Sequence, residues 1–293
     1  KQLVFFTKKI SLSSLEGLSL YDILELYILG IFKGAFSNRA SAIAFSFFMA
    51  LFPFALFILN LIPYIPIDNF QEDFLYFVEQ GVPPTTYDAI QTILQDIMSN
   101  SYQSLLSSGF IISILLMANG INAILGGFEM SAHITLSRGF VKQYLIALAI
   151  SLALSSLLLI TVSAIVVFEV FIQRIKLSGY ISEDVNLIIW GRYLFVILMI
   201  LIATSILYKF GTRETKKGDF ISYGAIFTTL LTIISSYLFG VYVEKFSRYN
   251  ELYGSIGTLL VLMFYIWINC MVLLLGFEIN ATISKLKRKK LYI

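Results

Sequence analysis

The sequence predicts an all-α integral membrane protein with six transmembrane helices, and three observations lead to this fold class. Hydrophobic residues make up 58% of the 293 residues, charged residues only 13%, and the mean hydropathy is +0.84. Soluble domains carry about 25% charged residues, so a water-soluble protein is not expected. The apolar stretches are long, unlike the alternating segments of an outer-membrane β-barrel. Lipid satisfies no backbone hydrogen bonds, which makes helices the expected spans.

A membrane-spanning helix needs roughly 20 mostly apolar residues, and six stretches of the chain meet this requirement. The third stretch is the most uniformly apolar, and the fourth contains Arg192 near its start. The expected spans are residues 40–65, 105–128, 144–168, 187–208, 220–243 and 253–279. Their even number puts both termini on one side of the membrane.

The distribution of Lys and Arg predicts which side that is, because basic loops stay in the cytoplasm. If both termini are inside, the inner segments hold sixteen of the twenty-one basic residues and the outer loops hold four. The inner segments are residues 1–39, 129–143, 209–219 and 280–293. Both ends of this multi-pass membrane protein are therefore expected to be cytoplasmic.

Three parts are expected along the chain: a cytoplasmic N-terminal segment (1–39), a six-helix transmembrane domain (40–283) and a basic cytoplasmic tail (284–293). Residues 14–36 mix apolar and charged side chains, which favours a helix lying at the inner membrane interface. The outer loop 66–104 carries six acidic residues and no basic ones. Its apolar residues recur at helical spacing on both sides of Pro83-Pro84, which predicts an amphipathic helical hairpin. That hairpin is either a solvated cap or a lid that attracts cations.

Few residues are suited to catalysis or to metal binding. One cysteine (Cys270) and one histidine (His133) exclude an intrachain disulfide, a zinc cluster and an HExxH site. Glu129 and His133, four residues apart, are interpreted as a structural pair at the membrane interface rather than as half of a metal site. No GxxxxGK[ST] motif is present, so nucleotide energy would have to come from a partner protein. No catalytic residue, cofactor or metal is expected, and the protein is predicted not to be an enzyme.

Polar residues inside the spans are the candidate functional residues, because charge at membrane depth requires a partner or water. Arg192 and Glu169 flank the outer halves of the fourth and third spans. Arg192 is expected either to pair with Glu169 or to meet an anionic headgroup. Asn119, Asn122 and Asn269 serve either as hydrogen bonds between helices or as contacts along a substrate path.

Glu278 ends a long apolar run, only seven residues before Lys285. At a rise of about 1.5 Å per residue it is expected near the inner interface, where its partner is the basic tail or Arg39. Two roles stay open for it: a structural ion pair between the first and sixth spans, or an inner gate.

Two motifs resemble those of the YihY/BrkB family of bacterial inner-membrane proteins. The first is the opening of the first span, "SNRASAIAFSFFMALFPFALF", which contains Arg39 and Pro53. The second is the last span, "YGSIGTLLVLMFYIWINCMVLLLGFEINATI". Its matching positions are Tyr253, Gly254, Ser255, Gly257, Trp267, Gly276, Glu278 and Asn280. Asn38 stands where the family often has Asp, and Gly211 where it commonly has Pro.

The resemblance implies a six-helix inner-membrane fold and suggests transport or lipid export. Some members were formerly labelled ribonuclease BN, a function disfavoured here because the cytoplasmic loops hold few acidic residues. The expected function is a transporter or a protein that exports or flips a lipid or amphiphile, without ATPase activity of its own. The alternative is a non-transporting scaffold for envelope assembly. Expected partners are membrane lipids, with anionic headgroups at the basic inner loops, and a lipid or amphiphile substrate. Nucleic acid is not expected, and homo-oligomerisation is left open.

Overall fold

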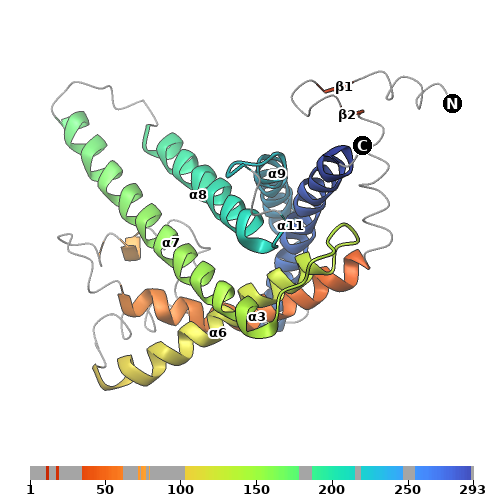
Figure 1. Ribbon diagram of the computed structural model, residues 1–293. Helices are drawn as coiled ribbons and strands as arrows, with labels where there is room; N and C mark the ends of the chain where they lie inside the picture. Colours follow the sequence, from red (N-terminus) through yellow and green to blue (C-terminus); the bar gives the residue numbers. More distant parts are fainter. Residues whose placement is uncertain are drawn as a thin grey trace. The chain divides into compact units, whose positions relative to one another are not determined.

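The computed structural model describes residues 11–12, 18–19, 35–61, 72, 74–76, 79, 103–177, 187–214, 219–246 and 255–291. Six long helices account for most of these residues (Figure 1). They are α3 (Phe36–Leu61), α6 (Gln103–Glu129), α7 (Phe140–Leu177), α8 (Leu187–Gly211), α9 (Tyr223–Phe246) and α11 (Ser255–Leu291). Two two-residue strands, β1 (Ser11–Leu12) and β2 (Leu18–Ser19), pair antiparallel with Ser11 opposite Ser19.

Four of these helices are long and apolar enough to cross a membrane, within the part of the chain that the structure describes. Their spans are Phe140–Ile172, Leu187–Gly211, Tyr223–Val243 and Leu260–Lys287, and they correspond to the last four predicted spans. The first two predicted spans are helical as well, in α3 and α6. In α6 the apolar stretch of described residues is shorter, Ile114–Glu129. The count of six spans and the orientation stay predictions.

Predictions for the N-terminal segment and the outer loop fall mostly outside the described residues. Of the expected interfacial helix, residues 20–34 lie outside them, and Leu18–Ser19 forms β2. In the outer loop the structure describes Glu72, Phe74–Tyr76 and Glu79, all of which are helical. The second half of the expected hairpin lies outside the described residues.

The chain divides into two compact units. Unit 1 comprises Lys1–Phe48, Asn119–Ile150 and Leu201–Ile293, and unit 2 comprises Met49–Ala118 and Ser151–Ile200. In unit 1 the ring of Phe128 stacks on Phe277, with centroids 4.1 Å apart, and meets Tyr208 edge-on. These side chains are buried and join the ends of α6 and α8 to α11.

Helices α9 and α11 approach closely in unit 1 because two glycines face each other. A Cβ atom on Gly276 would lie 1.8 Å from Oγ1 of Thr228 and 2.7 Å from the carbonyl oxygen of Gly224. Only residues without a side chain permit this approach, which is how membrane helices commonly pack. The hydroxyl of Tyr208 closes the contact, donating to the carbonyl of Leu273 at 2.7 Å.

In unit 2, too, a glycine allows two helices to pack closely. Phe168 of α7 packs edge-on against Phe195 of α8, and Gly191 leaves the space that the Phe168 ring occupies. The hydroxyl of Ser155 lies 3.1 Å from the sulfur of Met117, and both residues are buried. The aromatic contact brings the first part of α8 against α7, and the contact of Ser155 with Met117 joins α7 to α6.

Candidate functional site

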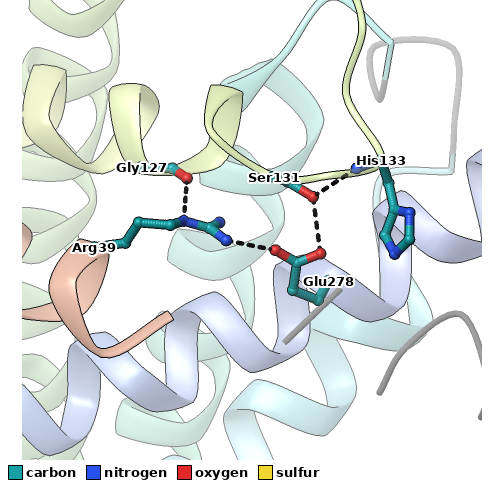
Figure 2. A network of polar contacts seen from close by, with 5 residues as sticks. All are labelled: Arg39, Gly127, Ser131, His133 and Glu278. Carbon is teal, nitrogen blue, oxygen red and sulfur yellow. Dashed lines mark hydrogen bonds and ion pairs between the residues drawn. The ribbon is translucent and has the colours of Figure 1, made fainter. Parts of the chain in front are cut away.

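The most enclosed polar group is a buried ion pair between α3 and α11 in unit 1. Nη1 of Arg39 donates to Oε1 of Glu278 at 2.8 Å, and the hydroxyl of Ser131 donates to Oε2 at 2.8 Å (Figure 2). Glu278 is 0% exposed and Arg39 is 3% exposed. Both carboxylate oxygens therefore accept a hydrogen bond from the protein, as a buried charge requires.

Arg39 also binds the end of α6, because its Nε donates to the carbonyl oxygen of Gly127 at 2.9 Å. This carbonyl belongs to the last turn of α6, where helix carbonyls have no partner within the helix. Cations are favourable at that end of a helix because the helix dipole is negative there. One guanidinium thus joins α3, α6 and α11, and the structure selects Arg39 from the two partners expected for Glu278.

On the face of α11 that carries Glu278, Lys285 lies further toward the C-terminus and contacts His133. Nζ of Lys285 is 3.4 Å from Nδ1 of His133, and the imidazole is buried. A lysine ammonium only donates, so Nδ1 is the acceptor in this contact and Nε2 is the ring nitrogen left to donate. The hydroxyl of Thr282, one turn beyond Glu278, is buried and has no hydrogen-bond partner among the described residues.

The interpretation of Glu129 and His133 as a pair spaced four residues apart on a helix is wrong. Helix α6 ends at Glu129, so the two residues do not share a helix face. Instead Oε2 of Glu129 accepts from the backbone N–H of Arg138 at 3.4 Å. No group of three or more His, Cys, Asp or Glu side chains able to hold a metal occurs within the described ranges.

The opposite face of α11 fixes the start of α9. Oδ1 of Asn280 accepts from the backbone N–H of Gly224 at 2.9 Å, and its Nδ2 donates to the hydroxyl of Ser222. Ser222 also accepts from the N–H of Ala225, which makes it the N-cap of α9. Gly276, four residues before Asn280, lies on the same face at the close contact with α9.

A second ion pair lies in unit 2, between Arg192 of α8 and Glu169 of α7. Nη2 of Arg192 donates to Oε2 at 2.9 Å, and Nε donates to Oε1, so the contact is bidentate. The two side chains are 27% and 13% exposed, in contrast to the buried pair of unit 1. Trp190 and Tyr193, beside Arg192 in the sequence, are 72% and 62% exposed.

The three asparagines are placed differently. Asn269 donates to the carbonyl of Tyr265 in its own helix, and Asn119 is exposed. Oδ1 of Asn122 is buried without a hydrogen-bond partner within the described part of the chain. The structure therefore brings together the pairs Arg39–Glu278 and Arg192–Glu169, and none of the asparagines bonds to either pair in the described contacts.

Polar contacts at the ends of α6 and α8 hold the loop between α6 and α7. Oε1 of Glu214 accepts from the backbone N–H groups of Thr135 and Leu136, at 2.9 and 3.0 Å. Arg138 donates to the last carbonyls of α8. The pKa of its guanidinium is lowered, mainly by partial burial, although the nearby carboxylate of Glu129 acts in the opposite direction. Sequence reasoning missed Ser131 and Glu214, because hydroxyls and acids in loops carry no periodic signal.

The sequence matches a known family model over most of its length and has relatives among bacterial proteins. The family model described as "Virulence factor BrkB" matches residues 33–291. A ribonuclease-like protein of Bacillus subtilis, YfkH, is 31% identical over 256 residues, covering 87% of this chain and 91% of the relative. A UPF0761 membrane protein of Coxiella burnetii is 23% identical over 253 residues, covering 84% and 87%. No solved structure matches the chain.

Proposed function

The chain belongs to the BrkB family, and from this premise we propose that it transports, exports or flips a lipid or other amphiphile across a bacterial cytoplasmic membrane. In this proposal the chain spans the membrane six times with both termini inside. It uses no ATP of its own. The apolar composition supports an amphiphilic substrate, because wide aqueous pores require polar linings and the spans here are apolar on most faces.

The observation that carries the proposal is the partly exposed pair of Arg192 and Glu169. Charges at membrane depth cost about 2.5–3.5 kcal/mol on insertion scales, so a partly exposed charged pair in two apolar helices requires a reason. An arginine fork binds phosphate or carboxylate in a bidentate manner. An anionic headgroup that competes with Glu169 for Arg192 would meet this fork on a helix whose Trp190 and Tyr193 side chains are also exposed. Aromatic residues of this kind favour the headgroup level of a bilayer.

The pair in unit 1 has a different part in the proposal. Both oxygens of Glu278 already accept hydrogen bonds, and neither side chain of the Arg39–Glu278 pair is open to the surface. We therefore assign this pair to holding the helices together rather than to substrate contact. In unit 1 the buried carbonyl oxygen of Asn122 has no hydrogen-bond partner among the described residues, so Asn122 stays a candidate for a polar contact within that unit.

Native mass spectrometry of gently extracted protein tests the proposal. We would compare the wild-type protein with Arg192→Ala and with the control Arg174→Ala, which removes an exposed arginine of α7 in the same unit. The expected result is a retained lipid or amphiphile on the wild type and on the control that is lost from Arg192→Ala. A Glu169→Gln variant should retain it, because it leaves the arginine free to bind the anion.

If the wild type, Arg192→Ala and Arg174→Ala carry the same annular lipids, or none, the proposed headgroup site is wrong. In that case the scaffold alternative becomes the better hypothesis, with its docking surface on the outer loop 66–104. The name of the Bacillus relative raises ribonuclease activity as another candidate for this chain. That candidate would require metal-dependent RNA cleavage by homogeneous protein, abolished by changing named acidic residues.

A further inference from the structure

One face of α11 continues beyond the buried ion pair with side chains that donate hydrogen bonds. Glu278, Thr282 and Lys285 are spaced i, i+4 and i+7, which places them on a common helix face. This face meets Ser131 and His133 of the segment that follows α6 (Figure 2). At Glu278, the first residue of this face, both carboxylate oxygens already accept hydrogen bonds from the protein.

The next part of this face, at Lys285, carries a positive charge that no carboxylate balances among the described residues. Arg39 and Glu278 neutralise each other, whereas Lys285 has no carboxylate partner among the described residues. Lys285 is only partly exposed, so it is not an ordinary solvated lysine. Its ammonium lies 3.4 Å from Nδ1 of a second basic side chain, the imidazole of His133.

The hydroxyl of Thr282 adds a third donor. It is 0% exposed and makes no hydrogen bond within the described residues, whereas hydroxyls of other helical residues, such as Thr229, bond to the carbonyl four residues earlier. A buried hydroxyl without a partner is unfavourable, and such groups commonly mark the position of a bound polar species. The site thus combines an ammonium, an imidazole and a hydroxyl on adjoining elements of unit 1.

We propose that Lys285, His133 and Thr282 form a binding site for a phosphate-type anion at the predicted cytoplasmic end of α11. An anion beside this contact compensates the charge of Lys285 and accepts from the ammonium, from the hydroxyl of Thr282 and from the other ring nitrogen of His133, Nε2. The ligand enters from the side of Lys285, with Thr282 at the inner wall of the site. This inference does not depend on transport, because a scaffold can hold an anion at the same place.

Two sources supply this chemistry: the phosphate of an anionic lipid headgroup, and free phosphate in the cytoplasm. Basic residues at the cytoplasmic end of a membrane helix favour the lipid source, because the inner leaflet is anionic. The basic residues Lys285 to Lys290 follow the last apolar run, at the depth where headgroups lie in the predicted orientation.

Thermal unfolding of the full chain in nanodiscs tests the site. The wild-type protein would be measured in phosphatidylcholine with increasing inorganic phosphate, with sodium chloride at equal ionic strength as the reference, and separately in nanodiscs containing phosphatidylglycerol. The variant Lys285→Gln removes the ammonium. The matched control is Lys142→Gln, an exposed lysine at the start of α7 in the same unit. Thr282→Val removes the hydroxyl and leaves every charge in place.

We expect phosphate or phosphatidylglycerol to raise the melting temperature of the wild type and of Lys142→Gln. Lys285→Gln should bind roughly tenfold more weakly, as for a lost charge-assisted hydrogen bond. Thr282→Val should also bind more weakly, although its melting temperature in phosphatidylcholine is unchanged or higher. A response to phosphatidylglycerol alone identifies a lipid ligand, and a response to inorganic phosphate in phosphatidylcholine identifies a soluble one.

Three results would overturn the proposal. The first is the absence of any response of the wild type to both probes. The second is an equal loss in Lys285→Gln and Lys142→Gln, which would mean diffuse attraction between basic residues and anions. The third is a Thr282→Val variant that binds both probes as the wild type does. Because this third variant retains all charges, it decides the question even if Lys285→Gln does not fold.

Discussion

Replacing Arg39 by methionine tests whether the buried ion pair holds α3, α6 and α11 together. Methionine approximates the length of the arginine side chain but removes its charge and its donors. Glu278 would stay 0% exposed with only the hydrogen bond from Ser131, and the carbonyl of Gly127 would lose its donor. The change therefore leaves a buried carboxylate without a counter-charge.

The expected cost follows from this geometry. Breaking a buried pair by removing one partner costs about 3–5 kcal/mol, because the remaining charge stays desolvated. Removing both charges is different, since an apolar pair of similar volume is often neutral or more stable. We therefore expect Arg39→Met to lower the free energy of unfolding by about 3–5 kcal/mol. The double variant Arg39→Met/Glu278→Leu should recover most of that loss.

Reversible unfolding in mixed micelles measures both variants. Trp267 is a suitable reporter, because its Nε1 donates to the hydroxyl of Ser41 on α3 at 3.2 Å. Its fluorescence should change when α3 leaves α11, and helical circular dichroism at the same denaturant concentrations would test two-state behaviour. The coupling energy follows from the double-mutant cycle with the two single variants.

Two results would refute the reasoning. One is an Arg39→Met variant that loses less than about 1 kcal/mol, the range of an exposed ion pair. The other is a double variant whose loss equals the sum of the single losses, which would mean that the two side chains do not act as a pair. Arg39→Lys serves as the control for charge, and should lie between wild type and Arg39→Met because lysine lacks the second donor direction toward Gly127.

Three further predictions concern the surrounding helices. Gly276→Ala should destabilise the fold by about 3 kcal/mol or prevent folding, because its Cβ would overlap Oγ1 of Thr228 at 1.8 Å; the control Gly240→Ala, with no atom within 4 Å, should stabilise it by about 0.5–1 kcal/mol in the same unfolding assay. Tyr208→Phe should cost about 1–2 kcal/mol through its lost hydrogen bonds, and an unchanged melting curve would contradict that. Glu214→Ala should speed amide hydrogen exchange at the backbone of residues 135 and 136, whereas Glu214→Gln, which keeps the acceptor oxygen, should not.

Hydropathy predicts the helices of this chain well because each apolar run has to close its backbone hydrogen bonds within itself. It predicts their ends less well. The expected spans end near residues 279 and 168, whereas the helices that contain them, α11 and α7, continue to Leu291 and Leu177. Lipid determines where apolar residues stop, but a helix of Lys, Arg and Ile is stable beyond that boundary when neighbouring segments pack against it.

The ion pairs were predictable as sets of candidates rather than as contacts. Arg192 with Glu169, and Glu278 with Arg39 or the tail, followed from the cost of charge at membrane depth. The third partners, Ser131 and the carbonyl of Gly127, were not predictable, because any hydroxyl or helix end near the pair could serve. The contact between Gly276 and Gly224 was not predictable either, because the sequence contains eighteen glycines and does not indicate which of them face each other.

The Gly-x-Glu-x-Asn motif of the last span makes contacts on two sides of α11. Gly276 and Asn280 face α9, where one permits close approach and the other binds the first turn of α9. Glu278, two residues from each, points to the other side of α11 and binds Arg39 and Ser131. A helix turns about 100° per residue, so this spacing lets one short segment hold neighbours on two sides.

This has a consequence for functional experiments. Loss of activity on changing Gly276, Glu278 or Asn280 would report a loosened bundle and would not identify a substrate site. Charged residues that keep part of their side chain exposed are the informative ones. Arg192 is partly exposed on its helix, and Lys285 has no carboxylate partner within the described chain, so variants at these two positions separate binding from folding.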